Sequence, residues 1–550
     1  MNDNLRKKIG SIPKRTWILI AIILIGIFLR TYKFHSWLEF ERDQVRDAFL
    51  VNDVVQGKEA WPIFGPTIKD SQDETGELFK IGPAYYYMQI TSAKLFGSSP
   101  EKMAYPDLLF SILTIPLLYL FLRRYFKTDI SLILTGLFAI SAFSLQYSRF
   151  AWNPNIIPFF TLLFLLSLHE MLAKKKGVSW RWIIFSGIAL GIGIQLHVVT
   201  LVLFPLVAFF VFSYLLAKDF KIFWKRIVCI FLVVLVFNST QVFSELKTGF
   251  SNSRIFFNSI LLNDAKNKES LFSKIGNTLD CHAEANAFML LAAGDDKCKF
   301  IHDKVLSANE SKKIKREVKD AGFISKLLLI FIFSLLGYAY LFYLAKKEKN
   351  SDKKYFLRLI VLFAFLSFLI MAPIANPDHS EFRYFLHSFF VPYVFLGLGF
   401  QVIARKKGDI FKLAAIAICS FIILTNYSRI SSEVEKLNSR NKSNDHYCVL
   451  GEVEKILDYM ILNSGGDREV YLYGKKRYVS TLYYALQYMA QRDGFNIMKV
   501  DDKDDITADA SVFYLSYPLS LKDDASMEID NRRIISFENF GQISVYNLEN

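Results

Sequence analysis

Long apolar runs separated by short polar connections form the main pattern along residues 1–427. Four of these runs carry almost no charge: Leu132–Ser148, Ile156–Leu172, Ile183–Phe210 and Leu327–Leu344. A hydrocarbon core about 30 Å thick needs about 20 apolar residues as a helix, and only helices or closed barrels satisfy backbone polar groups in lipid. The runs lack the alternation of barrel strands, so the pattern predicts membrane-spanning helices.

About eleven transmembrane helices are predicted in this way. The first is interpreted as an uncleaved helix, because no small-residue cleavage site follows it. Lys and Arg gather in alternate connections, whereas the short opposite connections hold Arg149 and Arg383. This asymmetry predicts a plasma-membrane protein with its N-terminus in the cytoplasm. The predicted helices are 17–35, 104–122, 131–148, 156–173, 182–198, 199–217, 226–243, 323–345, 356–373, 384–404 and 410–427.

Three longer segments then face outward, and they set the predicted domains. Residues 1–427 form the transmembrane domain, with a first outward loop at 36–103 and a long polar loop at 244–322. The tail at 428–550 mixes a helical pattern with short strand-like runs, so it predicts a small α/β domain outside the membrane. Its helix is expected at 453–462 and its strands at 469–473, 511–517 and 542–546.

Composition agrees with a membrane protein and argues against a nucleic-acid-binding protein. The chain is 52% hydrophobic and has a mean hydropathy of +0.26. Its net charge is +14, but the basic residues fall between apolar runs, as the positive-inside rule requires, so we expect no nucleic-acid partner. Cys281 and Cys298 share one polar loop, where a disulfide and two free thiols both stay open.

The most informative stretch is Phe40–Ala48, just after the first helix. Asp43 and Asp47 are four residues apart, so on a helix they share a face, and Arg46 can pair with Asp43. The following apolar residues predict an amphipathic helix lying in the membrane interface. A carboxylate there could act as a general base toward a hydroxyl or amine. The alternative is a solvated charged helix with no chemistry.

A second motif combines Lys80, Gly82-Pro83 and the aromatic residues Tyr85 and Tyr86. A Lys at headgroup level can hold a phosphate as a point charge, and the aromatic residues would line the substrate cavity. An aromatic belt with a snorkelling Lys explains the same residues without function.

Other polar residues stand at helix ends. Arg149, Trp152 and Asn153 follow the third predicted helix, and either face the outer cavity or make a plain helical hairpin with an interfacial Trp. Gln195 and His197 are polar residues inside an apolar run, which usually line a cavity but can also be satisfied by a neighbouring helix.

The last motif is 376–385, which holds Arg383 and Tyr384. The planar, permanently charged fork of Arg383 suits phosphate oxygens. An ion pair with Glu381 or Asp378 is the alternative. No convincing metal cluster is present, because His282 and His302 stand alone in the long loop.

In order along the chain, these motifs resemble the GT-C membrane glycosyltransferases, above all the protein mannosyltransferase and aminoarabinose transferase group (glycosyltransferase families 39 and 83). The resemblance covers roughly residues 17–400, and no single motif is specific. It rests on Leu29-Arg30-Thr31-Tyr32, Asp43-Gln44-Val45-Arg46-Asp47-Ala48, Gly82-Pro83-Ala84-Tyr85-Tyr86-Tyr87, Ser148-Arg149-Phe150-Ala151-Trp152-Asn153-Pro154-Asn155, Gln195-Leu196-His197 and Phe382-Arg383-Tyr384-Phe385.

The resemblance implies a hexosyl- or pentosyltransferase of the cell envelope that uses a polyprenyl-phosphate sugar at the outer membrane face. Asp43 matches the family's loop aspartate and becomes the first choice for the base, with Asp47 second. Arg46, Lys80 and Arg383 become the candidates for holding the donor phosphate. A divalent metal stays open because metal use varies across the fold, and the acceptor stays open among protein, lipid and glycan.

Two departures from the family weaken particular assignments. Many relatives carry Asp-Glu where this chain has Asp43-Gln44, and some carry Lys-Pro-Pro where this chain has Lys80-Ile81-Gly82-Pro83. The main competing function is a lipid or sugar transporter or flippase, which would place charges mid-helix within inverted repeats. A second is a membrane-anchored binding protein that uses 428–550 for recognition, which leaves the polar motifs of 39–103 unexplained.

Overall fold

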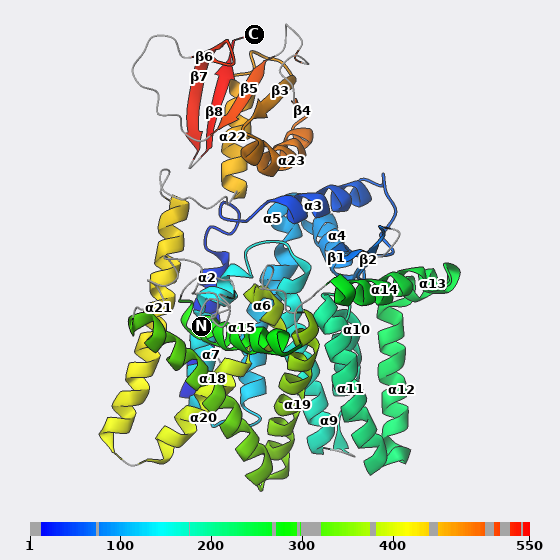
Figure 1. Cartoon of the computed structure of the whole chain (residues 1–550), viewed down its shortest axis with the longest axis vertical. Helices are drawn as coiled ribbons and strands as arrows, with labels where there is room; N and C mark the ends of the chain where they lie inside the picture. Colours follow the sequence, from blue (N-terminus) through cyan, green and yellow to red (C-terminus); the bar gives the residue numbers. More distant parts are fainter. Residues whose placement is uncertain are drawn as a thin grey trace, which may run out of the picture.

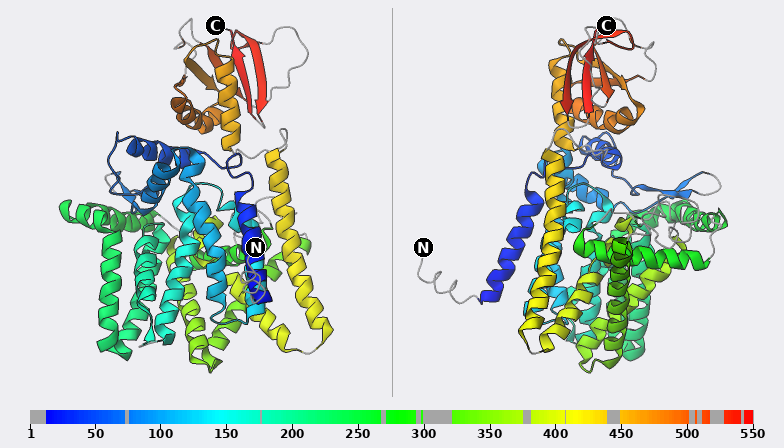
Figure 2. Two further views of the ribbon diagram at one scale, coloured as in Figure 1. Left: turned by 180° about the vertical axis from the view of Figure 1, so that it is seen from behind. Right: turned by 60° about the vertical axis from the view of Figure 1, so that its left-hand side comes forward.

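A computed structural model describes residues 13–72, 76–174, 177–266, 271–293, 298, 321–374, 381–406, 408–438, 449–500, 506, 511–516, 528–540 and 543–549. Upright helices form a bundle, and a small unit with a β-sheet lies beyond one end of it (Figure 1). The two other views agree on this arrangement (Figure 2). The predicted fold class, a polytopic helical protein with a small C-terminal α/β unit, is confirmed.

All eleven predicted transmembrane helices have counterparts, although some are bent or short. Among the described residues, six helices are long and apolar enough to span a membrane, or eight if two bent pairs each count as one. The counterparts are α2 (Lys14–Thr31), α6 (Tyr105–Leu122), α7 (Thr128–Ala139), α9 (Ile157–Lys174), α10 (Trp180–Gly193), α11 (Val198–Lys218), α12 (Phe220–Phe237), α18 (Ala321–Lys347), α19 (Ser351–Ile374), α20 (Val391–Arg405) and α21 (Asp409–Asn438).

Three predicted helices are wrong as single elements. The run 226–243 crosses a 74° bend between α12 and α13 (Ser239–Lys247), and the run 384–404 crosses a 57° bend between η3 (Phe382–Ser388) and α20. The run 131–148 divides into α7 and the short α8 (Ala142–Gln146), and Ser141 stands at the break. The Ser141 hydroxyl accepts a hydrogen bond from the backbone N–H of Ser144 at 3.4 Å, which satisfies a donor in the first turn of α8. Apolar content alone does not reveal such a break, because the predicted run continues through Ser141 to Ser148.

The first outward loop is mostly helical. It contains α3 (Arg42–Val55), α4 (Ala84–Phe96) and α5 (Pro100–Met103). Between α3 and α4 runs a short antiparallel hairpin of β1 (Thr67–Gln72) and β2 (Leu78–Lys80). The predicted amphipathic helix is therefore present, and its capping box places its start at Arg42.

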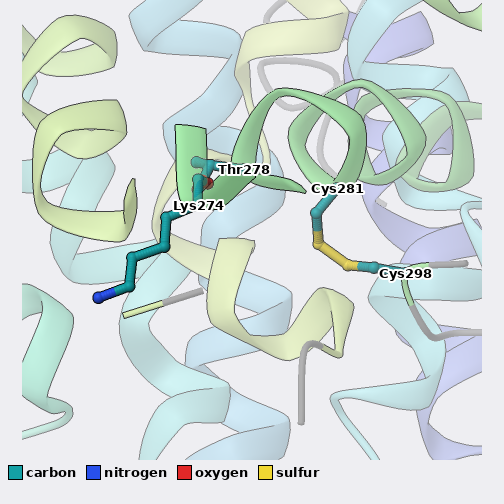
Figure 3. Close-up of a disulfide and its surroundings, with 4 residues drawn as sticks. All are labelled: Lys274, Thr278, Cys281 and Cys298. Atoms are coloured by element: carbon teal, nitrogen blue, oxygen red, sulfur yellow. A yellow bond between two sulfur atoms is a disulfide. The ribbon is translucent and has the colours of Figure 1, made fainter. Parts of the chain in front are cut away.

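The long polar segment at 244–322 is also helical where it is described. It holds the end of α13 (Ser239–Lys247), α14 (Ser251–Lys266) and α15 (Leu271–Leu291), which run across the bundle and not along it (Figure 1). Cys281 of α15 is joined to Cys298 by a disulfide (Figure 3). Of the two options that the sequence left open for these cysteines, the structure has the bond.

The C-terminal unit is a mixed sheet with two helices. Its order is β4 (Asn496–Lys499), β3 (Glu469–Gly474), β5 (Val512–Ser516), β8 (Ile543–Leu548), β7 (Arg532–Phe540) and β6 (Glu528–Ile529). β3 pairs in parallel with β4 and β5, and the remaining pairs are antiparallel. Helices α22 (Leu450–Leu462) and α23 (Lys476–Arg492) share a hydrophobic core with this sheet and with α3.

Candidate functional site

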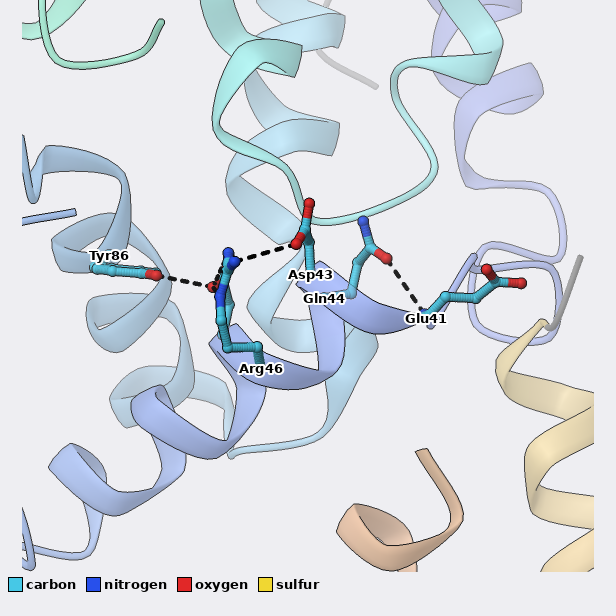
Figure 4. Close-up of polar contacts among 6 residues, drawn as sticks. Glu41, Asp43, Gln44, Arg46 and Tyr86 are labelled. Atoms are coloured by element: carbon cyan, nitrogen blue, oxygen red, sulfur yellow. Dashed lines mark hydrogen bonds and ion pairs between the residues drawn. The ribbon is translucent and has the colours of Figure 1, made fainter. Parts of the chain in front are cut away.

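The acidic residues of α3 lie where the helix begins. The side chain of Glu41 and that of Gln44 bond reciprocally to each other's backbone N–H groups, so the first turn is closed by a capping box. Asp43 and Asp47 then fall one turn apart on one face, as their spacing predicts. Figure 4 shows both helix start and acidic turn, with Tyr86 of α4 reaching across to them.

Asp47 is the buried member of this pair, with 1% of its surface exposed. Its Oδ1 atom accepts hydrogen bonds from Arg46 Nη2 at 2.7 Å, from Arg46 Nε at 2.9 Å and from the Tyr86 hydroxyl at 2.8 Å. Burial raises the pKa of Asp47 to about 6, against the opposing effect of Arg46. The same burial, followed by the nearby negative charge of Asp47, raises the pKa of Tyr86, so Tyr86 stays a donor at neutral pH.

Asp43 is different in its surroundings. Arg46 Nη1 donates to Asp43 Oδ1 at 3.1 Å, and 46% of the Asp43 side chain is exposed. One guanidinium therefore bridges two carboxylates, of which one is buried and one is accessible. An accessible carboxylate held by a positive charge can meet an incoming hydroxyl, whereas Asp47 is enclosed by protein.

A further buried carboxylate, Asp107, lies in the first turn of α6 and was missed by sequence reasoning. It is fully buried and accepts a hydrogen bond from the Tyr85 hydroxyl at 2.6 Å and one from the backbone N–H of Trp152 at 3.3 Å. The signal was present in the sequence, because an ionisable residue inside an apolar helix marks a functional site by default.

Trp152 links Tyr85 and Asp107 to the last motif, residues 376–385, and these contacts form one row. The Arg383 guanidinium lies over the Trp152 ring at 5.4 Å and over the Tyr384 ring at 5.4 Å. Tyr384 in turn meets the ring of His197 at 5.6 Å. The structure thus brings together Tyr85 of the second motif and residues of the three motifs that follow it.

Arg383 also forms the ion pair that the sequence offered as its alternative explanation. Its Nε lies 2.9 Å from Glu381 Oε2, and 36% of the Arg383 side chain is exposed. A half-exposed ion pair of this kind contributes little stability. Its remaining exposed surface leaves the guanidinium accessible to an anion.

Gln195 and Asn153 have structural contacts. Gln195 Oε1 accepts the backbone N–H of Ala84 at 3.1 Å, and its amide nitrogen donates to the carbonyls of Gly191 and Phe237, each at 2.9 Å. A Cβ at Gly82 would lie 2.2 Å from Gln195 Oε1, so only glycine fits there. Gln195 therefore fixes the start of α4, which carries Tyr85 and Tyr86, and the Asn153 amide donates to the Leu196 carbonyl beside it.

Arg149 lies outside this row of residues. Its guanidinium donates to the carbonyls of Leu29, Arg30 and Tyr32 at 3.2, 3.4 and 2.7 Å. These are the orphan carbonyls at the end of α2, which basic side chains commonly cap. The ring of Trp37 packs against its other side at 5.6 Å. The contacts of Arg149 thus account for it as a helix cap, and the cavity role that its sequence position predicted finds no support in them.

Lys80 is exposed on β2, and its backbone is fixed by another segment. Asn252 of α14 accepts the Lys80 N–H at 2.9 Å and donates to the Lys80 carbonyl at 2.9 Å. Phe79 stacks beside Phe256 with ring centroids 4.9 Å apart. The segment that holds α14 therefore fixes the backbone at Lys80, a link that sequence reasoning did not foresee.

Arg30 is the second residue whose place was not foreseen, although it belongs to the motif at the end of the first helix. It is completely buried, and its guanidinium donates to the hydroxyls of Ser111 and Ser144 at 2.8 and 2.7 Å. Both serines line a small cavity with room for about 20 Å³ of water-sized contents. That is enough for a water molecule or a single hydroxyl group, so this cavity does not hold a whole sugar.

The described residues contain no group of three or more His, Cys, Asp or Glu side chains that could hold a metal ion. His282 instead contacts the Tyr338 hydroxyl in the helical bundle, and His302 lies outside the described residues. The question of a divalent metal therefore stays open.

The family described as dolichyl-phosphate-mannose-protein mannosyltransferase matches residues 80–242 of the chain. No curated protein matches it in sequence. The matched part contains Tyr85, Tyr86, Asp107, Trp152 and His197, which form the middle of the row described above.

Solved structures extend the likeness over nearly the whole chain. ArnT from Cupriavidus metallidurans without ligand matches with a TM-score of 0.51 and 12% identity over 97% of both chains. ArnT bound to undecaprenyl phosphate matches with 0.50 and 12% over 97% of this chain and 98% of that one. The oligosaccharyltransferase of Archaeoglobus fulgidus matches with 0.50 and 15% over 88% of this chain and 62% of that one. At these identities the likeness shows a shared fold.

Proposed function

We propose, from the GT-C fold of this membrane protein and its mannosyltransferase-like sequence over residues 80–242, that it transfers a sugar from a polyprenyl-phosphate donor to an acceptor at the outer membrane face. One observation carries the proposal above the others. Arg46 holds the accessible carboxylate of Asp43, and a chain of contacts leads from buried Tyr85 and Asp107 through Trp152 to a second cation, Arg383.

The proposed step uses these residues as follows. The acceptor hydroxyl gives its proton to the Asp43 carboxylate while its oxygen forms a bond to the anomeric carbon of the sugar. The bond between that carbon and the phosphate oxygen breaks, and the electron pair leaves with the polyprenyl phosphate, so the configuration inverts. General-base help of this kind is typically worth about 10²–10⁴ in rate.

Cationic side chains support the leaving group in this proposal. Charge that develops on the phosphate is stabilised by preorganised cations more strongly than in water. Arg383 offers a partly exposed guanidinium next to Trp152 and Tyr384, and Lys80 offers an exposed ammonium on a strand whose backbone is bonded to α14. ArnT, which shares the fold, has been crystallised with undecaprenyl phosphate, which supports a polyprenyl carrier here.

The decisive experiment incubates the purified protein with polyprenyl-phosphate sugars of several hexoses and pentoses and measures released polyprenyl phosphate. Protein, lipid and glycan acceptors are added one at a time. Release that depends on both a donor and an acceptor supports the proposal. Absence of release from every donor, together with movement of the donor across vesicle membranes, would make this chain a flippase instead.

The proposed orientation places the C-terminal unit and α3 outside the cell and the N-terminus inside. Exposed residues allow a direct test, because Glu59 and Asp467 lie on the proposed outer side and Gly177 on the inner side. Single cysteines at 59 and 467 should react with an impermeant thiol reagent in intact cells, whereas one at 177 should not. The reverse labelling pattern would place the proposed site in the cytoplasm.

A further inference from the structure

The C-terminal unit is joined to the segment just before α3 by backbone contacts. Leu450 N–H donates to the Leu38 carbonyl at 2.8 Å, and Gly451 N–H donates to the Ser36 carbonyl at 3.3 Å. A Cβ at Gly451 would lie only 3.0 Å from the oxygen of Ser36. Even alanine at 451 would therefore push this backbone aside by a few tenths of an ångström.

Tyr488 of α23 makes the corresponding side-chain contact with α3. It is 1% exposed, and its ring meets the edge of Phe40 at 5.7 Å and that of Phe49 at 5.1 Å. Its hydroxyl donates to the Ser98 carbonyl, just before α5, at 2.6 Å. Phe40 and Phe49 lie on either side of the acidic turn in the sequence, so one tyrosine supports the helix at both ends of that turn.

The opposite side of α3 rests on α4. There the contact with the acidic turn is polar, since Tyr86 donates to Asp47. The apolar residues Val45, Ala48 and Val51 are buried in the same hydrophobic core as α22 and α23. The helix is thus enclosed between α4 and α23, and its position depends on both (Figure 1).

We infer that Tyr488 is a positioning residue for sugar transfer, and that the C-terminal unit holds α3 so that Asp43 and Arg46 meet the donor and acceptor in register. The inference rests on the proposed function of α3. A displacement of about 1 Å at a catalytic group can cost about 10²-fold in rate. A unit far along the chain can therefore control turnover without touching substrate.

The test compares three substitutions in the full-length protein. Tyr488→Ala removes the ring between Phe40 and Phe49, and kcat should fall about ten- to a hundredfold. KM for the donor should rise at most about threefold, because two of the three proposed phosphate-holding cations, Lys80 and Arg383, lie outside α3. Tyr488→Phe keeps the ring and loses the bond to Ser98, so it should recover most of kcat. Tyr484→Ala is the matched control, since Tyr484 is 56% exposed on the same helix and its loss should leave kcat unchanged.

A second measurement keeps the inference testable if Tyr488→Ala folds poorly or if no sugar donor is found. Gly451→Ala disturbs the same junction through Ser36 and should also lower kcat. Hydrogen exchange of amides 42–55 should speed up at least tenfold in Tyr488→Ala and Gly451→Ala but not in Tyr484→Ala. Unchanged exchange in both variants, or an equal loss of kcat in Tyr484→Ala, would overturn the inference. Faster exchange in Tyr488→Ala and Gly451→Ala, together with no transferase activity in the unmodified protein, would contradict the proposed function alone.

Discussion

Asp43 and Asp47 stand one turn apart on α3 and share the guanidinium of Arg46, yet 46% of the Asp43 side chain is exposed and 1% of Asp47. Burying an unpaired carboxylate is costly, so Asp47 needs both Arg46 and Tyr86. Asp43 has only part of its surface engaged. We therefore assign the proposed proton-accepting role to Asp43 and a supporting role to Asp47, which holds Arg46 in place.

Asp43→Asn should lower turnover by about 10²–10⁴, the range typical of lost general-base help. Asn keeps the shape of Asp and can still accept a hydrogen bond from Arg46, but it cannot take a proton. The variant should therefore fold and bind donor nearly normally. Steady-state kinetics with a confirmed donor, alongside a donor-binding measurement, would check both halves of this prediction.

Asp47→Asn is the comparison that separates the two carboxylates. It removes the buried charge, whose pKa is raised in the fold, so folding stability at neutral pH should stay the same or rise. It also leaves Arg46 with a neutral partner and holds it less firmly, so turnover should fall, but by less than in Asp43→Asn. If Asp47→Asn abolished turnover and Asp43→Asn did not, the base would be Asp47.

The pH dependence of turnover should show the buried carboxyl. Burial raises the pKa of Asp47 to about 6, so its charge is lost as pH falls through that value. Asp43 is then the sole charged partner of Arg46 on α3. The two side chains pair more tightly, so the Asp43 carboxylate is less available to the acceptor hydroxyl. We expect kcat to fall below about pH 6. Asp47→Asn mimics the protonated form, so its kcat at pH 7 should already resemble that of the unmodified protein at low pH.

The raised pKa of Asp47 affects folding stability in the opposite direction, because stability falls as pH rises. Asp47 titrates near 6 in the folded chain but near 3.9 when unfolded, so the folded state binds the proton more tightly. The stability that protonated Asp47 contributes is fully present below about pH 4 and is lost as pH rises through about 6. Two pKa units correspond to about 3 kcal/mol. The stability difference between Asp47→Asn and the unmodified protein, measured by thermal unfolding, should therefore grow in favour of Asn as pH rises.

The apolar pattern was sufficient to predict the bundle and the helix that carries the acidic turn. Hydrophobic length identifies spans because lipid leaves few alternatives, and the four-residue spacing of Asp43 and Asp47 defines one helical face. The order of motifs also indicated the fold. These are local properties of the sequence, and each can be recognised without knowledge of distant contacts.

Distant contacts explain what the sequence did not reveal. Asp107 is in place because Tyr85 and Trp152 meet it from two other segments, and no local spacing encodes that meeting. Arg149 was expected to face the outer cavity because it stands beside Trp152 at the end of a predicted helix, yet its donors cap the end of α2. The placement of Tyr488 beside Phe49 joins residues more than 400 positions apart in sequence, which no periodic pattern can indicate.

Arg383→Ala should weaken donor use by about ten- to a hundredfold, because a charge-assisted hydrogen bond is worth roughly 1.5–3 kcal/mol. Arg383→Lys should restore only part of it, since Lys lacks the planar fork that lies over Trp152 and Tyr384. Donor affinity, measured by titration with the polyprenyl-phosphate sugar, is the readout for both variants.

Glu381→Gln separates this role from a structural ion pair. It removes the carboxylate 2.9 Å from Arg383 Nε and leaves the guanidinium charged. If Arg383 holds the phosphate, donor affinity in Glu381→Gln should stay the same or increase. Unchanged donor affinity in Arg383→Ala, with matching losses of stability in both variants, would make the pair purely structural.

The last prediction concerns Asn252, which bonds the backbone of Lys80 on both its N–H and carbonyl sides. Each neutral hydrogen bond is worth about 0.5–1.5 kcal/mol, so Asn252→Ala should weaken donor binding about three- to tenfold by freeing β2. If Asn252 acts only through Lys80, the double variant Lys80→Ala/Asn252→Ala should bind donor no worse than Lys80→Ala alone, which is the coupling that a double-mutant cycle detects. Ser253→Ala, one position further on α14, should leave donor affinity unchanged. Strictly additive losses would mean that Asn252 and Lys80 contribute separately to donor binding, and Asn252 would then not act by positioning Lys80.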